Sequence, residues 1–508
     1  MSSAPAHPGV YVPETPSGVR TIAGVPTSVV AFVGRAKRGP VDEPVTISNY
    51  GDFERIFGGL WRQSSMSYSV CHYFLNGGQT AVIVRVDNGA TPATFAGRSF
   101  SLQAASPGLW GEELKNIAIT LEVDPDKIKK DSRVFNISVT DGATGTVENF
   151  FNVSAVEGST RFVGRVLEEE SHLIRVLGKV PQTRPLKGIL SLDANSASDG
   201  SPLTASNILG DPNTRTGIYA LEKADIFNLL CIPSYNDGSS SGDLYATAYP
   251  AALKFCLDKR AVLLVDPPSN WTDKDTVMRN LDSLNLQSEN AAFYFPRIRV
   301  ADPLEGGKAR EFVPCGAVAG VIARTDGQRG VWKAPAGIDA TLAGVLGLSV
   351  GDQNVILTDG ENGELNPLGV NCLRIFPAMG PIVWGARTLK GADRLASERK
   401  YLPVRRTALF IEETLYRGTQ WAVFEPNDEP LWSQIRLNVG AFMHSLFTQG
   451  AFQGPTPKDA YFVKCDGETT TQDDVNKGIV NVIVGFAPLR PAEFIVLKIR
   501  QLAGRVAT

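Results

Sequence analysis

The sequence has little of what metal sites and most hydrolytic sites need. Its 508 residues include only four histidines and six cysteines, and no two cysteines are spaced Cys-x-x-Cys. A zinc site or a disulfide framework is therefore not expected, and scattered cysteines are typical of a chain that folds in a reducing cytoplasm. Histidine is also absent from residues 216–345. These absences predict no metal, no cofactor and no catalytic residue.

An excess of charge of one sign and a long apolar run are missing as well. Fifty Lys and Arg face 53 Asp and Glu, for a net charge of −3. Nucleic-acid binding, which clusters Lys and Arg, is not expected. No stretch reaches the roughly 18 apolar residues of a membrane span, so no direct membrane insertion is expected. The first eight residues have no basic or apolar region, so we do not expect a secretory signal there.

Two short motifs suggest chemistry but lack their context. Gly238-Ser239-Ser240-Ser241-Gly242 matches the nucleophile elbow of serine hydrolases, yet it lies in a Ser/Gly-rich loop with no histidine in the surrounding region. A flexible loop is the better interpretation, and an α/β hydrolase or protease that uses Ser239–Ser241 stays an alternative. Gly34–Gly39 follows an apolar run like a phosphate loop, but Pro40-Val41 replaces the required Lys-Ser/Thr.

What the chain does contain is ordinary globular sequence, 43% hydrophobic, long enough for three or four domains of roughly 150 residues each. Shifts in pattern predict a mixed α/β and α+β multidomain fold. The first segment holds four prolines and reads as an extended arm. The expected segments are an N-terminal arm (1–20), a compact α/β part (21–94), a mostly-β insertion (95–205), a mainly parallel α/β domain (206–350), an α+β domain (351–490) and a C-terminal strand or arm (491–508).

Periodicity supports these assignments. Ile117, Ile119 and Leu121 alternate with polar or small residues, which indicates a strand, and the Gly-containing stretch 141–145 indicates a hairpin. In 216–345, apolar runs separated by helical patterns predict a helix-covered, mainly parallel sheet.

The clearest helix is predicted after Asn427. Asn427 or Asp428 can cap it, and Pro430 suits its first turn. One face is apolar at helical spacing, formed by Leu431, Ile435, Val439, Phe442 and Leu446. Two strand-like runs follow, at 479–486 and 494–499. A terminal strand that is apolar on both faces needs a partner, in its own sheet or in another copy.

Several stretches resemble the contractile tail sheath family of phage tails, tailocins and phage-tail-like injection systems. The resemblance lies in motifs near both ends and in the second half of the chain: Tyr401–Glu413, Val423-Phe424-Glu425-Pro426-Asn427, Gly450–Gly454, Pro491–Ile495, Pro8–Glu14, Val331–Gly337 and Asn366–Asn371. It is weakest over 95–205.

This resemblance implies a structural protein that is not an enzyme. Segments 21–94 and 351–490 would form an inner domain, 206–350 a subtilisin-like domain without protease activity, and 95–205 an outer module. Copies would stack as hexameric rings around an inner tube protein, with baseplate and terminal cap proteins as further partners. Contraction would drive the tube through a target envelope. The particle would assemble in the cytoplasm and then be released, anchored to a membrane or retained.

The resemblance also directs attention to particular residues. In strand exchange between subunits, Val10 and Val12 would face one side of a neighbour's sheet and Tyr11 the other. At the far end, Phe494, Val496 and Lys498 would share one face. The candidate tube contact is the polar face of the predicted helix, with Gln434, Arg436 and Asn438, although a simple solvated face fits equally well. A closed-shell self-assembling protein is a further alternative.

Overall fold

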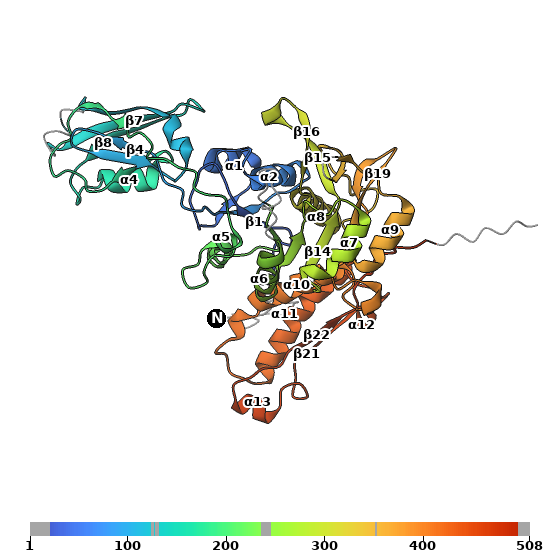
Figure 1. The fold of residues 1–508 in the computed structure, drawn as a ribbon. Helices are drawn as coiled ribbons and strands as arrows, with labels where there is room; N and C mark the ends of the chain where they lie inside the picture. Colours follow the sequence, from blue (N-terminus) through green and yellow to red (C-terminus); the bar gives the residue numbers. More distant parts are fainter. Residues whose placement is uncertain (1–20, 123–125, 127–131, 235–244, 351–352, 496–508) are drawn as a thin grey trace, which may run out of the picture. The chain divides into compact units, whose positions relative to one another are not determined.

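The computed structural model describes residues 21–122, 126, 132–234, 245–350 and 353–495, and the chain divides into two compact units (Figure 1). The large unit comprises Thr27–Gln328 and Ala334–Leu402. The small unit comprises the chain up to Pro26, Arg329–Lys333 and the chain from Pro403 onward, as far as these parts are described.

An eight-stranded sheet is the framework of the large unit, in the order β2-β3-β1-β12-β13-β14-β19-β20. The six strands from β3 to β19 run parallel to their neighbours, whereas β2 and β20 pair antiparallel at the two edges. The predicted mainly parallel sheet is thus confirmed. The strands are β1 (Val30–Gly34), β2 (Val45–Ile47), β3 (Ala81–Arg85), β12 (Leu229–Cys231), β13 (Val262–Val265), β14 (Ala291–Phe295), β19 (Val370–Phe376) and β20 (Gly380–Val383).

Both faces of this sheet are buried, which explains why its strands read as continuous apolar runs. On β1, Ala31 and Val33 face a cluster that also contains residues of α6, while Phe32 meets Tyr73 of α2 edge to face at 5.7 Å. The helices of this unit are α1 (Tyr50–Phe57), α2 (Ser65–Leu75), α4 (Val163–Glu170), α5 (Ala205–Leu209), α6 (Tyr245–Asp258), α7 (Lys274–Asn280), α8 (Cys315–Arg329) and α9 (Asp359–Leu365).

Small residues on α8 allow it to lie directly against α2. A Cβ at Gly316 would come within 2.1 Å of the Ser69 carbonyl oxygen, and one at Gly320 within 2.5 Å of the Tyr73 carbonyl oxygen. The small residues of α8 therefore have a packing function, because a side chain at Gly316 or Gly320 would push the two helices apart.

The insertion is mostly β, as predicted. Two four-stranded sheets, β10-β6-β7-β8 and β11-β4-β5-β9, enclose one apolar cluster. The predicted hairpin at 141–145 joins β7 to β8. The strands are β4 (Thr94–Ala96), β5 (Ser101–Ala104), β6 (Leu114–Thr120), β7 (Val134–Asp141), β8 (Val147–Ser154), β9 (Ile174–Leu177), β10 (Gly188–Ile189) and β11 (Ser191–Leu192).

A further antiparallel sheet, β16-β15-β17-β18, completes the large unit. Its strands are β15 (Arg297–Asp302), β16 (Lys308–Phe312), β17 (Val345–Val350) and β18 (Gln353–Asn354).

The small unit packs two long helices against a two-stranded sheet. Its elements are α10 (Leu402–Gly418), α11 (Glu429–Thr448), α12 (Pro457–Ala460), β21 (Tyr461–Lys464), α13 (Gln472–Asn476) and β22 (Ile483–Phe486). The prediction for α11 is confirmed. The Asp428 side chain accepts a hydrogen bond from Leu431 N at 3.2 Å, and the five predicted apolar residues are all buried.

Three sequence expectations differ from the structure. Segment 21–94 was expected to join 351–490 in one domain, yet its strands β1 and β3 lie in the same sheet as β12–β14, and β19 and β20 extend that sheet. The change of unit comes near residue 402 instead of 351. The run 479–486 forms a strand only from Ile483. Ile479 N instead donates to Asp474 O at 2.9 Å, which closes the turn after α13.

Candidate functional site

The described histidines form no catalytic arrangement. His72 is buried on α2 against the ring of Phe312, and this burial lowers the pKa of His72 to about 4. His172 and His444 are exposed. His7 and the Gly238–Gly242 motif lie outside the described residues, so the structure does not test the hydrolase alternative at its serines.

One buried carboxyl at the carboxyl end of the parallel strands resembles an active-site acid. Asp266 follows β13, is 0% exposed, and accepts a hydrogen bond from Cys315 N at 2.8 Å. Burial raises the pKa of Asp266 to about 7, while the hydrogen bonds from Cys315 and the charge of Arg297 act in the opposite direction. A substrate cannot reach a side chain that is fully enclosed, so this carboxyl is part of the core.

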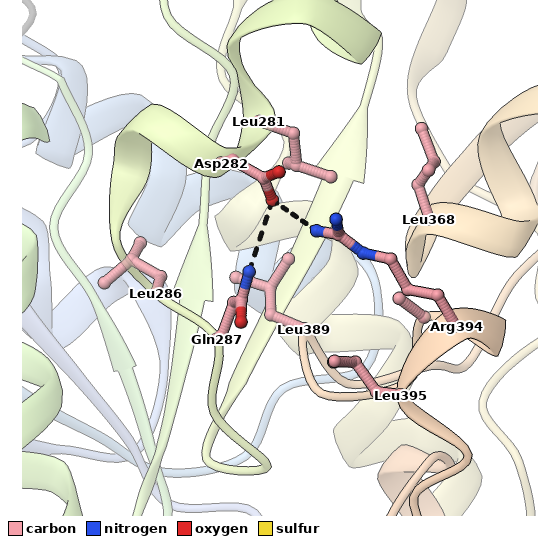
Figure 2. A pocket seen from close by; sticks show the side chains of 9 residues that line it. Leu281, Asp282, Leu286, Gln287, Leu368, Leu389, Arg394 and Leu395 are labelled. Carbon is pink, nitrogen blue, oxygen red and sulfur yellow. Dashed lines mark hydrogen bonds and ion pairs between the residues drawn. The ribbon is translucent and has the colours of Figure 1, made fainter.

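The pocket drawn in Figure 2 is too small for an organic substrate. It has room for about 20 Å³ and is lined mainly by leucines, among them Leu281 and Leu389. A single water molecule already needs roughly 10–15 Å³ on such a measure. Arg394 Nη2 donates to Asp282 Oδ1 at 2.7 Å across the pocket, and Gln287 donates to the same oxygen at 3.3 Å. The polar groups at this pocket therefore bond to one another.

The basic loop after β1 bonds to protein groups. Lys37 Nζ lies 3.2 Å from Glu113, Arg38 Nη1 lies 3.0 Å from Asp141, and the Arg35 guanidinium stacks over Trp61 at 4.9 Å. The cationic side chains of Gly34–Gly39 therefore have protein partners, and a bound phosphate is not needed to explain their presence. Among the described residues, no group of three or more His, Cys, Asp or Glu side chains could hold a metal ion.

The two-stranded sheet of the small unit is the strongest candidate for an assembly site. One face packs on the helices through Tyr461, Val463, Val484 and Phe486. The other face carries Phe462, which is 51% exposed, and Ile483, which is 48% exposed. Phe462 lies over Gly485 of the paired strand, where a Cβ would come within 2.3 Å of the ring. The outer face, which also carries the exposed Lys464 opposite Ile483, is therefore mainly apolar and largely uncovered.

The edges of this sheet can accept further strands. Ala487 N donates to Ala460 O at 2.8 Å, which makes these two residues a hydrogen-bonded pair. Because such pairs alternate along an antiparallel ladder, Val463 on β21 and Val484 on β22 direct their backbone groups outward. Among the described residues, no other strand pairs with either one. Each strand thus leaves one row of backbone donors and acceptors open along its own length, whereas directly after β22 Phe452 bridges Pro488 and Gln453 N donates to Ala487 O.

The structure describes only some of the predicted site residues. Val10, Tyr11, Val12, Val496 and Lys498 lie outside the described residues. Phe494 is described, is 73% exposed, and does not lie in a strand.

The predicted polar face on α11 is corrected. Asn438 is 2% exposed, whereas Gln434 is exposed. Arg436 is half-buried and ion-paired with Glu429 at 2.6 Å. Residues two apart on a helix do not share a face, so Arg436 cannot extend a surface formed by Gln434 and Asn438. Contact of Gln434 or Arg436 with a tube stays a prediction.

Sequence reasoning missed the outer face of the small sheet and the loop before α11. Phe462 and Lys464 alternate with the half-buried Tyr461 and Val463, a pattern that could have identified the outer face. Nothing in the sequence signalled that Phe424 would be fully exposed with a φ of +69°.

Comparisons with known proteins agree on one family. Residues 210–389 match the family model described as the phage tail sheath protein central domain, and residues 397–501 match the phage tail sheath C-terminal domain. The tail sheath protein of Burkholderia phage BcepMu is 24% identical over 477 residues, which cover 88% of this chain and 87% of that protein.

Solved structures show the same fold at low identity. The sheath of the PVC extracellular contractile injection system in its contracted state has a TM-score of 0.60 at 22% identity, with 99% of each chain covered. The helical sheath of the anti-feeding prophage in its contracted state has a TM-score of 0.59 at 24% identity, covering 98% of this chain and 100% of that one. A sheath tail protein of Listeria innocua has a TM-score of 0.60 at 14% identity, covering 92% and 96%.

Proposed function

Because this chain belongs to the contractile tail sheath family, a family of structural proteins from phage tails and tail-like injection systems, we propose that its copies stack as hexameric rings around an inner tube and contract to drive that tube through a target envelope. The observation that carries the proposal is the sheet β21–β22, with two open edges and a mainly apolar outer face.

A two-stranded sheet of this kind is incomplete in physical terms. Two strands alone are marginally stable in water, and open edges invite pairing with another chain. Added strands would satisfy the outward backbone groups of Val463 and Val484 and would cover Phe462 and Ile483. The sheet thus has the chemistry of an acceptor for strands from other subunits.

The two ends of the chain are the proposed donors. Gly9–Val12 is short, apolar and bounded by Pro8 and Pro13, and Phe494–Ile499 is short and mostly apolar and follows Pro491. Val10 and Val12 would face one side of a neighbour's sheet and Tyr11 the other. Phe494, Val496 and Lys498 would present one face of the second added strand. Each subunit would then be linked to more than one neighbour.

Such links would keep the subunits connected while the sheath contracts. The extended sheath would be a kinetically trapped state assembled on the tube from a baseplate, and contraction would let the rings slide and rotate into a wider, lower-energy array. A gain of about 1–3 kcal/mol per subunit, the size of a modest coupling energy, sums to a large driving force over many copies.

The other parts have supporting roles in this proposal. The parallel sheet would be the subtilisin-like domain, used as a rigid body without catalysis, and the insertion an outer module. Baseplate and terminal cap proteins would be partners, nucleic acid would not, and the chain would not insert directly into a membrane. Assembly would take place in the cytoplasm. Among the described residues, no helix is long and apolar enough to cross a membrane.

Deletion of residues 1–20 tests the proposal. The shortened chain should give soluble subunits that form no cylinders in negative-stain images, because one donor strand is missing. A full-length variant with serine at Val10, Tyr11 and Val12 should behave in the same way, and serine at Ala4 and Ala6 is the matched control that should assemble. Normal cylinders from the shortened chain would refute the proposal that the N-terminal segment donates a strand to a neighbouring subunit. Closed particles from the full-length chain would favour a shell protein instead.

A further inference from the structure

The insertion and the parallel sheet have separate apolar cores. Among the described residues, the apolar cluster of the insertion lies between Ala93 and Ala197 in sequence, and the cluster on one face of the parallel sheet takes no residue from that range. Hydrogen bonds and ion pairs join the two bodies, made mainly by Arg85 and by the loop Gly34–Gly39. Because a polar boundary can open without exposing apolar surface to water, one body can turn on the other at low cost.

The two connections to the insertion pair with each other and form a short neck. This neck comprises residues 88–92 and 198–202. Within it, Thr91 and Ser198 exchange two backbone hydrogen bonds, at 2.9 Å and 3.0 Å. The Arg35 guanidinium donates to Asp199 O and so holds the base of the neck on the sheet. A connection of a few residues can absorb the changes in φ and ψ that occur when one body turns on another.

Beyond the neck, Arg38 connects the insertion directly to α1. Its Nη1 donates to Asp141 Oδ2 at 3.0 Å, and its Nη2 donates to Arg55 O, in the last turn of α1, at 2.9 Å. The guanidinium also lies 5.6 Å from the ring of Trp110 in the insertion. The Arg38 and Asp141 side chains are largely buried in this contact, so loss of one charge would leave the other without its counter-charge.

Lys37 makes a second ionic contact beside Arg38. Its Nζ lies 3.2 Å from both carboxylate oxygens of Glu113, and both side chains are partly exposed. Gly39 N adds a hydrogen bond to Ser106 Oγ at 2.9 Å. Three successive residues of the loop thus bond to the insertion through polar groups that water can satisfy when the contact opens, which is what a releasable contact requires.

We propose that the insertion turns as one body about its neck, and that Lys37 and Arg38 form a releasable clasp that fixes its orientation on the parallel sheet. The inference depends only on contacts within one subunit and goes beyond the proposed function. In a sheath that shortens, release of this clasp would let each insertion follow new neighbours while the parallel sheet keeps its own core. The basic loop thereby serves to position a module.

The test measures one distance in the free, full-length subunit by pulsed electron paramagnetic resonance. Spin labels are attached to cysteines introduced at Gly158 in the insertion and at Lys254 on α6, both of which are exposed. Cys71 is replaced by serine in all variants, because the other five native cysteines are buried and will not take up label.

Arg38→Glu breaks the clasp by placing one carboxylate against another. Arg55→Glu is the matched charge reversal outside the clasp, at an exposed arginine of α1. Arg38→Lys keeps the positive charge. If Arg38→Glu does not fold, Arg38→Met, which keeps an aliphatic stem without the charge, takes its place.

The unmodified chain and Arg55→Glu should give one narrow distribution of distances. Arg38→Glu should broaden this distribution or add a second maximum, and Arg38→Lys should return it to the narrow form. The backbone amide protons of β6, β7 and β8 should exchange with solvent at the same rate in every variant, because the insertion keeps its own fold when it turns.

An unchanged distance distribution in the variant that breaks the clasp would overturn the inference. Faster amide exchange throughout β6, β7 and β8 would overturn it too, because the contact would then be part of the fold of the insertion and not a joint. Neither measurement requires assembly. A chain that forms no cylinders would therefore refute the proposed function and leave this inference standing.

Discussion

At the scale of single residues, burial decides what the polar side chains can do. Asn438 and Gln434 were predicted to serve the same contact, yet one is 2% exposed and the other lies in solvent. Sequence shows residue type and spacing, but a polar residue on the buried side of a helix looks like one on the exposed side. Phe424 is the converse case, because an aromatic residue in a loop is usually expected to pack.

Asp266 is the residue whose burial has the clearest measurable consequence. Its pKa is raised by burial from an ordinary value of 3.8 to about 7. The folded chain therefore holds the proton more tightly than the unfolded chain. The stabilisation from this proton is fully present below about pH 4 and is lost as the pH rises through about 7.

We therefore predict that Asp266→Asn becomes progressively more stable relative to the unmodified chain between pH 5 and pH 8. Asparagine keeps an oxygen that can accept from Cys315 N, and it has no charge to bury. The difference in the free energy of unfolding should change by a few kcal/mol, since one pKa unit corresponds to about 1.4 kcal/mol. Denaturant unfolding at several pH values measures it. A difference that stays constant over this range would contradict the prediction.

At the scale of elements, the predictions that held depend on local signals. Helix α11 was located correctly because its cap, its first-turn proline and its apolar spacing all lie within its own sequence. Strand pairing depends on a partner distant in sequence, so the strand expected over 479–486 was too long. There Asn481 N donates to Thr470 Oγ1 at 3.0 Å, an interaction that no short window of sequence reveals.

The open edge of β22 gives a prediction at this scale. Val484→Pro removes a backbone N–H that points away from β21, so the ladder within the subunit should persist while an added strand loses a donor. We expect a folded subunit, by circular dichroism, that assembles poorly or not at all. Val484→Ala is the control for the lost packing of the side chain. Full assembly of the proline variant would show that this edge is not used.

At the scale of the whole molecule, the fold class could be predicted but the grouping of its parts could not. The parallel sheet was expected because apolar runs alternate with helical patterns. Its strand order, however, places β1 directly beside β12, with β3 on the other side of β1, although the whole insertion lies between β3 and β12 in sequence. The sequence pattern shows where the chain changes from one type of secondary structure to another, but it does not show which distant strands pair with each other.

The proposed role of the chain ends belongs to this scale as well. The sheet β21–β22 has capacity for further strands, and the apolar segments at 9–12 and 494–499 have the matching chemistry. Neither observation alone identifies the copy that supplies a strand. Strand exchange between subunits makes the polymer the functional unit, whereas pairing within one subunit would make each copy self-contained.

Strand exchange between subunits is tested most directly by electron cryomicroscopy of the assembled particle, at a resolution that separates strands. We predict that β21 and β22 form the centre of a larger sheet whose added strands are the Gly9–Val12 and Phe494–Ile499 segments of other subunits. A sheet that remains two-stranded in the assembled cylinder, or one that is completed by the subunit's own ends, would contradict the account.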